Sequence, residues 1–214
     1  GYYLFDIEQN NLKPFKDLRG STGNTEISSY RTEADGRLWI GTAGAGLYLQ
    51  ERKGNRRLFY RSGNSGEDYI LNIQAGEDYL WLGTLNGVII LDRTTGRVKA
   101  RYNTNNGLPY NRIDQICLLG GGNAAIATKT DRIYTVNIED GVSSRSGIMR
   151  GPTMNVITSG FRSSDGSIWA ATAGNGVFEF RGDSVISYTR AEGLLSDYCY
   201  SILADSLNRI WIGH

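Results

Sequence analysis

The chain has 214 residues, which is enough for one or two domains with a buried core. Its 23 basic and 22 acidic side chains give a formal net charge of +1, so no global field attracts polyanions, which argues against nucleic-acid or membrane-surface binding. The chain holds 28 glycines against 3 prolines, with 13 tyrosines and 4 tryptophans, and this composition indicates many short strands joined by tight turns.

No long apolar segment is present in the sequence. The apolar stretches are as short as residues 88–91, so we expect no bilayer-spanning segment and no signal peptide. Residues 1–3 and 211–214 look cut out of a repeat unit. We therefore expect an excised piece of a longer protein, with any targeting signal or anchor outside it.

The predicted elements begin with a strand at residues 1–5, which copy residues 46–49. The first full unit then reads as short strands joined by turn signals. Its elements are, in order, a turn at Asp35-Gly36, a strand at 38–42, a loop of small residues at 43–46, a strand at 47–49, a turn at Gly54-Asn55 and a strand ending near Tyr60.

The later units repeat this order. Turn signals recur at 76–78, 121–123, 165–166 and 207–208, and the loop of small residues recurs at 85–87 and 173–176. The third strand recurs at 88–90, 133–135 and 177–180, and the second turn at 95–96, 140–141 and 182–183. Each unit therefore predicts four short strands joined by hairpins.

The units are anchored at Trp39, Trp81, Ala125, Trp169 and Trp211, which include every tryptophan of the chain. The anchors are spaced 42, 44, 44 and 42 residues apart. No helical period runs through any unit. A four-stranded sheet at this period is typical of a propeller blade, so we predict an all-β fold, a β-propeller of four-stranded antiparallel blades.

We predict a single propeller region over residues 1–214 with five blade repeats. Each anchor tryptophan is expected to lie on the second strand and to fill the space between neighbouring blades. The small residue two positions later is expected to relieve crowding in the same layer. These small residues are Gly41, Gly83, Ala127, Ala171 and Gly213.

The two ends of the chain leave two arrangements open. The chain opens with strands three and four of a unit and closes with strands one and two. The ends could complete one blade and close a five-bladed ring. Alternatively, the chain is a fragment of a larger propeller, with an open edge or an intermolecular partner such as a second copy in a homodimer.

Groups suited to catalysis or metal binding are scarce. The single histidine, His214, belongs to no credible catalytic triad, and no spacing fits zinc, so we expect no catalytic residue, no metal and no cofactor. Cys117 and Cys199 are expected to be small buried hydrophobes rather than a disulfide. The carboxylate pairs at 67–68 and 77–78 are interpreted as solvated turn residues rather than a glycosidase pair.

The repeat resembles the two-component regulator propeller repeat. The matching stretches are 35–47, 78–88, 165–177 and 207–214, together with the loops 106–111 and 192–197. The recurrence of the Trp-x-Gly-Thr core with the Gly-Leu loop makes the match more specific than a generic blade pattern. The third unit departs from it, because Ala125 replaces tryptophan and residues 129–132 replace the glycine loop.

This resemblance implies the periplasmic sensor part of a hybrid two-component histidine kinase in the inner membrane. Such sensors detect oligosaccharides released from polysaccharides by glycan-degrading Gram-negative bacteria. In that family the propellers often form two large rings, followed by a β-sandwich domain, a membrane helix and a kinase. Rings of that family usually hold more than five blades, which favours the fragment alternative. Neighbouring blades or the sandwich domain are the implied protein partners.

Ligand binding is expected where the inter-blade loops and the loops after the second strands gather at one end of a propeller. Sugar recognition needs planar aromatic rings together with amides and charged groups. The candidate ligand-binding residues are Tyr69, Asn86, Tyr110, Asn111, Arg112, Lys129, Asp131, Arg132, Asn175 and Tyr198. Lys129 and Arg132 would suit an acidic sugar, although Asp131 could pair with either as ordinary surface charge.

Three functions remain open at this point. The leading hypothesis is a non-enzymatic domain that binds an oligosaccharide and signals to a histidine kinase. The alternatives are a propeller enzyme such as a polysaccharide lyase, and a protein-interaction scaffold.

Overall fold

The computed structural model describes residues 3–6, 11–14, 25–52, 54–127, 133–143, 157–181 and 184–214. Within these ranges the chain is built from short strands without an α-helix, and the paired strands are antiparallel. The all-β prediction is confirmed. No helix in these ranges has the length and apolarity that a membrane span needs.

Four sheets of the described chain have four strands each, and in each sheet the strands pair in chain order. We call these sheets blades 1 to 4. Their strands are β3 (Ile27–Thr32), β4 (Leu38–Thr42), β5 (Leu47–Gln50) and β6 (Arg56–Tyr60); β7 (Ile70–Ala75), β8 (Tyr79–Thr84), β9 (Gly87–Asp92) and β10 (Val98–Tyr102); β11 (Gln115–Gly120), β12 (Asn123–Ala127), β13 (Ile133–Asn137) and β14 (Gly141–Ser143); and β15 (Ile157–Arg162), β16 (Ile168–Thr172), β17 (Val177–Arg181) and β18 (Ser184–Tyr188).

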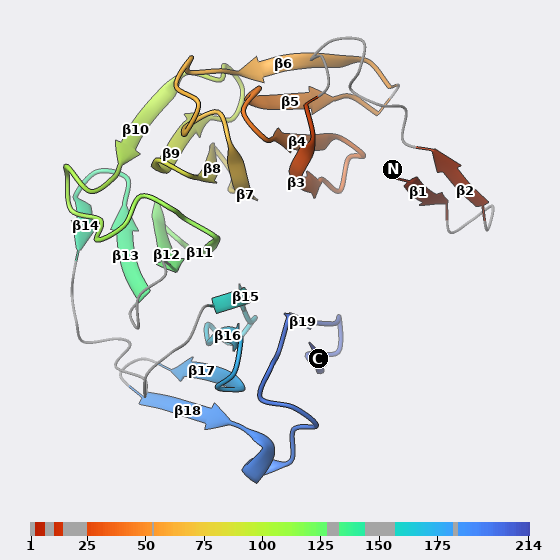
Figure 1. The fold of residues 1–214 in the computed structure, drawn as a ribbon, viewed down its shortest axis with the longest axis vertical. Coiled ribbons are helices and arrows are strands. Elements are labelled where there is room, and N and C mark those ends of the chain that lie inside the picture. The colour runs from red at the N-terminus through yellow and green to blue at the C-terminus, as the bar shows by residue number, and fades with distance from the viewer. Residues whose placement is uncertain are drawn as a thin grey trace.

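Each end of the chain carries a two-stranded sheet. The strands are β1 (Tyr3–Asp6) with β2 (Asn11–Pro14), and β19 (Ser201–Ala204) with β20 (Ile210–Gly213), preceded by the 3₁₀ turn η2 (Arg190–Glu192). The two sheets are not hydrogen-bonded to each other, so the ring closure that the sequence left open is not formed in this structure. Figure 1 shows β1–β2 lying apart from β19–β20.

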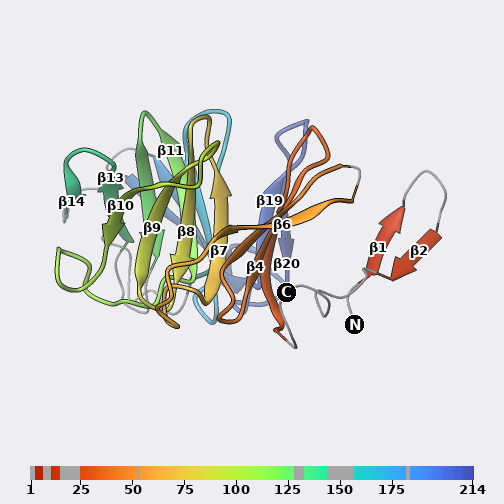
Figure 2. The same cartoon turned by 90° about the horizontal axis from the view of Figure 1, so that it is seen from above.

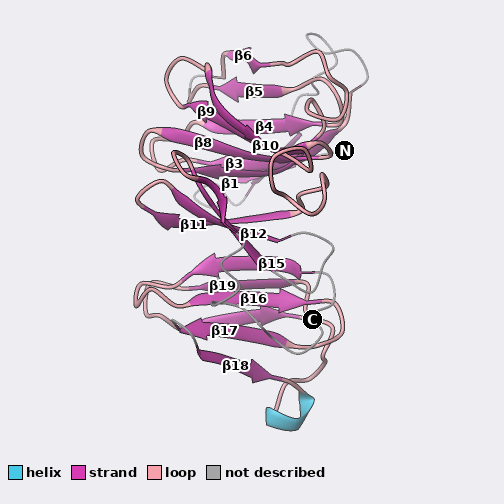
Figure 3. Cartoon of the chain, turned by 90° about the vertical axis from the view of Figure 1, so that its left-hand side faces the viewer, coloured by secondary structure: helices cyan, strands magenta, loops and turns pink. Residues whose placement is uncertain are grey.

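The blades stand side by side around an arc, with their first strands innermost (Figure 1). β3, β7, β11, β15 and β19 contact one another in that order, while the fourth strands of the blades lie on the outside. Figure 3 shows the strands of successive blades stacked along the arc. This is the radial arrangement expected of a propeller.

Hydrogen bonds from side chains of the first strands join each blade to the next. Across the four boundaries they run from Ser29 Oγ to Ile70 O (2.8 Å), from Asn72 Nδ2 to Gln115 Oε1 (3.4 Å), from Gln115 Nε2 to Thr158 O (2.9 Å) and from Thr158 Oγ1 to Cys199 O (2.5 Å). We call this series the inner belt. The inner belt explains why a small residue follows the anchor two positions later. A Cβ on Gly41 would lie 2.3 Å from Ser29 Oγ, which is part of the belt.

The anchor residues lie on equivalent strands, as predicted, and those of blades 1 to 4 face the sheet that follows along the arc. Trp39 on β4 is fully buried and packs against residues of blade 2, while Phe59 on β6 of its own blade packs edge-on against its ring, with 4.7 Å between the ring centroids. Trp81 on β8 packs in the same way against blade 3. The predicted role of the tryptophans in filling the space between blades is confirmed at these two boundaries.

The last two tryptophans are less buried. Trp169 is half-buried and stacks on Tyr188 at 5.5 Å. Trp211 is 55 % exposed, because among the described residues no blade packs against that side of β20. The Trp211 indole N–H donates to Asp205 Oδ2 (3.0 Å) and, with backbone N–H groups, holds the pKa of Asp205 at about 2.

Ala125 takes the tryptophan position in blade 3 and packs against blade 4. Phe178 and Phe180 occupy this boundary, and a cavity of about 20 Å³ remains beside Ala125. Replacing Ala125 with tryptophan should therefore overpack the boundary and lower the free energy of unfolding by about 1–3 kcal/mol. Urea denaturation would measure the loss, with Ala125→Val as a smaller control. A variant as stable as the parent would contradict this account.

The two cysteines are free thiols. Cys199 is fully buried, and Cys117 is half-buried. Burial raises the pKa of Cys117 to about 11, so this thiol stays protonated at neutral pH. Cys199 is buried as predicted, whereas Cys117 is buried only in part.

The loops gather at two opposite ends of the strands (Figure 2). The inter-blade face carries the connections between blades, such as 61–69, 103–114 and 189–200, and the loops after the second strands. The hairpin face carries the turns between first and second strands, such as 33–37 and 76–78, and those between third and fourth strands.

Candidate functional site

A buried threonine at the end of a second strand shapes the loop that follows it. Thr42 Oγ1 donates to Gly46 O (2.7 Å), Thr84 Oγ1 to Gly87 O (2.9 Å) and Thr172 Oγ1 to Gly176 O (2.8 Å). The same hydroxyl oxygens accept a backbone N–H from the loop, and Asn86 and Asn175 are two of these donors. The threonine of the repeat therefore fixes both predicted asparagines on the inter-blade face.

The connections between blades dock onto these loops through their backbones. The N–H groups of Gly44 and Gly46 both donate to Asp68 O at 3.1 Å, and Gly87 N donates to Asn111 O at 2.6 Å. Gly174 N and Gly176 N donate to Asp197 O at 3.0 and 2.8 Å. The three acceptor residues, Asp68, Asn111 and Asp197, therefore hold the same position in their connections.

The residue after each acceptor carries a predicted ligand contact. Tyr69 and Tyr198 pair with Ala43 and Ala173 in isolated β-bridges, and Arg112 occupies the matching position in the connection between blades 2 and 3. Tyr69, Arg112 and Tyr198 are therefore held at equivalent points just before an inner strand. These three side chains differ in exposure, since Tyr69 is half-buried while Arg112 and Tyr198 are exposed.

Two of the predicted residues, Asn111 and Arg112, form side-chain hydrogen bonds within the protein. Asn111 Oδ1 accepts the backbone N–H of Thr104 (2.8 Å), which leaves its amide nitrogen for a ligand. Arg112 donates to Asp114 (2.8 Å from Nε to Oδ1), and this contact raises the pKa of Arg112. An anionic ligand at Arg112 would have to share the guanidinium with Asp114.

The other predicted residues fall into two groups. Asn86 lies against Gly66, and Tyr69 lies near enough to Arg112 to raise the pKa of Arg112 slightly, so these side chains lie over blades 1 to 3. Tyr110, in the connection between blades 2 and 3, is 50 % exposed. Asn175 and Tyr198 lie at the boundary between blade 4 and β19–β20. Lys129, Asp131 and Arg132 lie outside the described residues.

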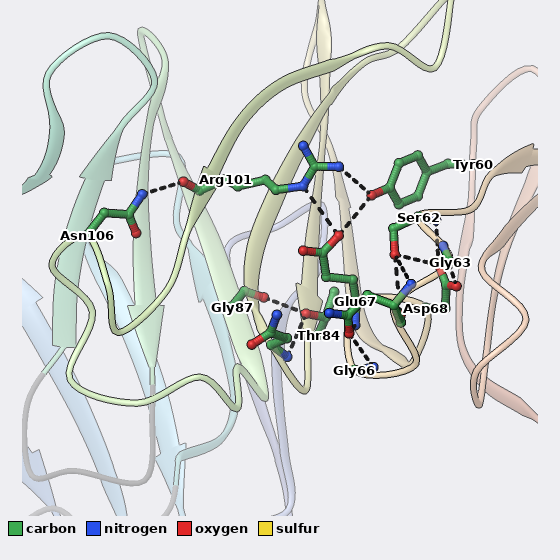
Figure 4. A network of polar contacts seen from close by, with 12 residues as sticks. Tyr60, Ser62, Gly63, Gly66, Glu67, Asp68, Thr84, Gly87, Arg101 and Asn106 are labelled. Atoms are coloured by element: carbon green, nitrogen blue, oxygen red, sulfur yellow. Dashed lines mark hydrogen bonds and ion pairs between the residues drawn. The ribbon is translucent and has the colours of Figure 1, made fainter.

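The interpretation of residues 67–68 as solvated is wrong. Asp68 is 1 % exposed, and its carboxylate accepts the backbone N–H groups of Ser62 (2.7 Å) and Gly63 (3.0 Å). The carboxylate therefore closes the turn of the connection, as Figure 4 shows. Asp197 makes the equivalent contact to Arg190 N (2.8 Å). The exposed pair Glu77 and Asp78 is solvated, as predicted.

A polar network at the boundary of blades 1 and 2 was not predicted. Arg101 donates to Glu67 Oε2 and to the Tyr60 hydroxyl, both at 3.3 Å, and Tyr60 contacts Glu67 at 3.4 Å (Figure 4). Burial raises the pKa of Tyr60, so its phenol remains a donor at neutral pH. The recurring tyrosine at the end of the fourth strand, as in Tyr102 and Tyr188, is the signal that could have drawn attention to it.

Comparison with solved structures gives the fold. An extracellular domain of the hybrid two-component system BT3049 of B. thetaiotaomicron superimposes with a TM-score of 0.57 at 20% identity, covering 99% of this chain and 34% of that one. The WD40 β-propeller domain of Doa1 gives a TM-score of 0.64 at 10% identity, covering 87% of this chain and 60% of that one. This chain is a β-propeller.

A third similar structure is an enzyme. A catalytically inactive virginiamycin B lyase from Staphylococcus aureus superimposes on the propeller with a TM-score of 0.70 at 12% identity, covering 99% of this chain and 69% of that one. The propeller spans about a third of the length of the BT3049 extracellular domain. No family model and no curated protein sequence matches the chain.

Proposed function

We propose that this propeller is an extracytoplasmic sensor domain that binds an oligosaccharide on its inter-blade face and signals to a histidine kinase outside this chain. The observation that carries the proposal is the equivalent placement of Tyr69, Arg112 and Tyr198. Each is held by backbone hydrogen bonds at the point where a connection enters an inner strand. A rigid support of this kind lowers the entropy cost of binding.

The chemistry of these side chains suits a sugar. Exposed tyrosine rings offer flat apolar surface for the C–H face of a pyranose and a hydroxyl for its edge. The Asn86 side chain and the free amide nitrogen of Asn111 add hydrogen-bonding groups for ring hydroxyls. An acidic sugar is favoured by Arg112 and by the predicted contribution of Lys129 and Arg132.

The cellular context of the proposal rests on likeness of fold. The BT3049 domain is extracellular and belongs to a hybrid two-component system, and its fold is shared by this chain. This likeness supports our proposal that the propeller lies in the periplasm, as the sensor part of an inner-membrane protein. Neighbouring blades, a sandwich domain or a second copy of the chain are proposed to complete the assembly.

A propeller lyase is the second candidate, favoured by the TM-score of 0.70 to virginiamycin B lyase. That enzyme is inactive as a histidine-to-alanine variant. The histidine of this chain, His214, is exposed, with its Nδ1 3.7 Å from Cys199 Sγ. Turnover of a uronic-acid polymer, seen as new ultraviolet-absorbing chain ends, would establish the lyase and overturn the sensor proposal.

Titration calorimetry with neutral and acidic oligosaccharides tests the sensor proposal. Binding without consumption of the ligand is expected, and Tyr69→Ala or Tyr198→Ala should weaken it about tenfold, as loss of a main contact does. Tyr30→Ala is the matched control, since Tyr30 is 70 % exposed but lies on β3 away from the connections. Equal affinity in the parent and both site variants would contradict the placement of the ligand.

A further inference from the structure

A groove of about 440 Å³ opens on the hairpin face, between blades 2 and 3. We propose that this groove binds a neutral sugar ring, and that Trp81 Nε1 donates a hydrogen bond to one of its hydroxyls. The side chains that line it include Glu77, Asp78, Tyr79, Trp81, Leu118 and Ile138. The groove lies on the opposite face from the site of the proposed function and does not depend on it.

The preceding boundary shows how this space is closed elsewhere. Between blades 1 and 2, Glu33 Oε1 accepts the indole N–H of Trp39 at 2.5 Å, and the other oxygen of Glu33 pairs with Arg93. Arg93 also donates to Gly76 O at 2.6 Å. A carboxylate and a guanidinium therefore fill this boundary and satisfy the tryptophan.

Both of these groups are missing at the next boundary. Gly76 takes the position of Glu33, since Glu33 N donates to Arg37 O and Gly76 N to Tyr79 O, each at 2.9 Å across its hairpin. Ile138 takes the position of Arg93, as each is the first residue after a third strand and bonds through its N–H to the neighbouring hairpin. The groove is the space that an ion pair occupies one blade earlier.

The loss of the carboxylate leaves the Trp81 indole with an unused donor. Trp39 donates to Glu33, and Trp211 donates to Asp205 at 3.0 Å. For Trp81 Nε1, the part of the chain that the structure describes supplies no acceptor, and the indole lines the groove. A ligand with a hydrogen-bond acceptor at this depth would complete the pattern seen at the other two tryptophans.

The rest of the lining selects the ligand class. Leu118 and Ile138 offer apolar contact, while the exposed carboxylates of Glu77 and Asp78 accept hydrogen bonds and repel anions. A sugar hydroxyl can accept from Trp81 and donate to a carboxylate, and the ring has an apolar face. The volume lies within the range of about 300–1,000 Å³ that is typical of ligand pockets. A neutral sugar satisfies all of these conditions, and a uronic acid does not.

The test follows the four indole N–H signals of ¹⁵N-labelled protein by NMR, with the Trp81 signal assigned from Trp81→Phe. The probes are cellobiose, xylobiose, mannobiose and lactose, with digalacturonate as the acidic comparison. We expect the Trp81 signal to shift with at least one neutral disaccharide and to stay in place with digalacturonate. No shift with any neutral probe would overturn the proposal.

Two substitutions at one position sharpen the test. Gly76→Glu restores the carboxylate that blade 1 has. A Cβ there would lie 3.6 Å from Leu118, an ordinary contact, and 3.3 Å from Tyr79 O, a tight contact that a small shift relieves and that Gly76→Ala shares. Gly76→Glu should weaken disaccharide binding about tenfold or more, whereas Gly76→Ala should retain it. Equal binding by both variants would overturn the role of Trp81 Nε1. In the backbone amide spectrum of the same labelled protein, shifts confined to residues of the inter-blade face would refute the groove and leave the proposed function standing.

Discussion

Replacing Trp39 with alanine is expected to lower the free energy of unfolding by about 3–5 kcal/mol, whereas Trp211→Ala should cost less than about 1 kcal/mol. The two residues hold the same position of the repeat. Trp39 is fully buried against blade 2, and its removal leaves a cavity and deprives Glu33 of its indole donor. Trp211 is 55 % exposed and forms one hydrogen bond to Asp205.

Urea denaturation followed by far-ultraviolet circular dichroism would measure both losses, because this signal does not depend on the substituted indoles. Equal slopes of the unfolding free energy against urea would show that the variants expose the same surface. Similar losses for Trp39→Ala and Trp211→Ala would contradict the packing of the first tryptophan between blades, since both indoles donate to a carboxylate and the main difference between them is burial.

Gly46→Ala is expected to cost about 3 kcal/mol or more, and Gly44→Ala in the same loop only about 1 kcal/mol. Both glycines have a positive φ, of +87° at Gly46 and +103° at Gly44, so both variants carry the conformational penalty of an alanine in this region. A Cβ on Gly46 would lie 2.3 Å from Tyr60 O, while a Cβ on Gly44 meets nothing within 4 Å. The difference between the variants isolates the steric clash.

The same clash recurs in two other blades. A Cβ on Gly87 would lie 2.1 Å from Tyr102 O, and one on Gly176 would lie 2.0 Å from Tyr188 O. Gly87→Ala and Gly176→Ala should therefore lose as much stability as Gly46→Ala in thermal and urea unfolding. If Gly44→Ala and Gly46→Ala were equally stable, the close approach of the fourth strand to this glycine would be disproved.

The fold could be predicted because its signal repeats. Each tryptophan comes with the same turn and small residue, and all but Trp211 with the same threonine, and the pattern assigns Trp39 and Trp211 to equivalent strands. The pattern could not predict that one is buried and the other exposed. That difference depends on whether a further blade packs against the strand, which the local sequence does not encode.

The candidate site was predicted less completely. The inter-blade loops were chosen correctly as the place where Tyr69, Arg112 and Tyr198 gather on one face, but their role in binding stays a prediction. The burial of Asp68 was missed, because its partners are backbone N–H groups of a turn whose path the sequence does not give. The groove beside Trp81 was missed because it arises from an absent side chain at Gly76.

The inner belt has a consequence for how a signal could travel through this molecule. Within the described residues, its hydrogen bonds link each inner strand to the next one along the arc, the last of them through Cys199, just before β19. Mechanical coupling is then a nearest-neighbour series, as in linear repeat proteins, and a displacement at one boundary reaches a distant blade only by passing through every blade between them. Side chains such as Gln115, which bonds to both neighbours, would set how much of the displacement is transmitted.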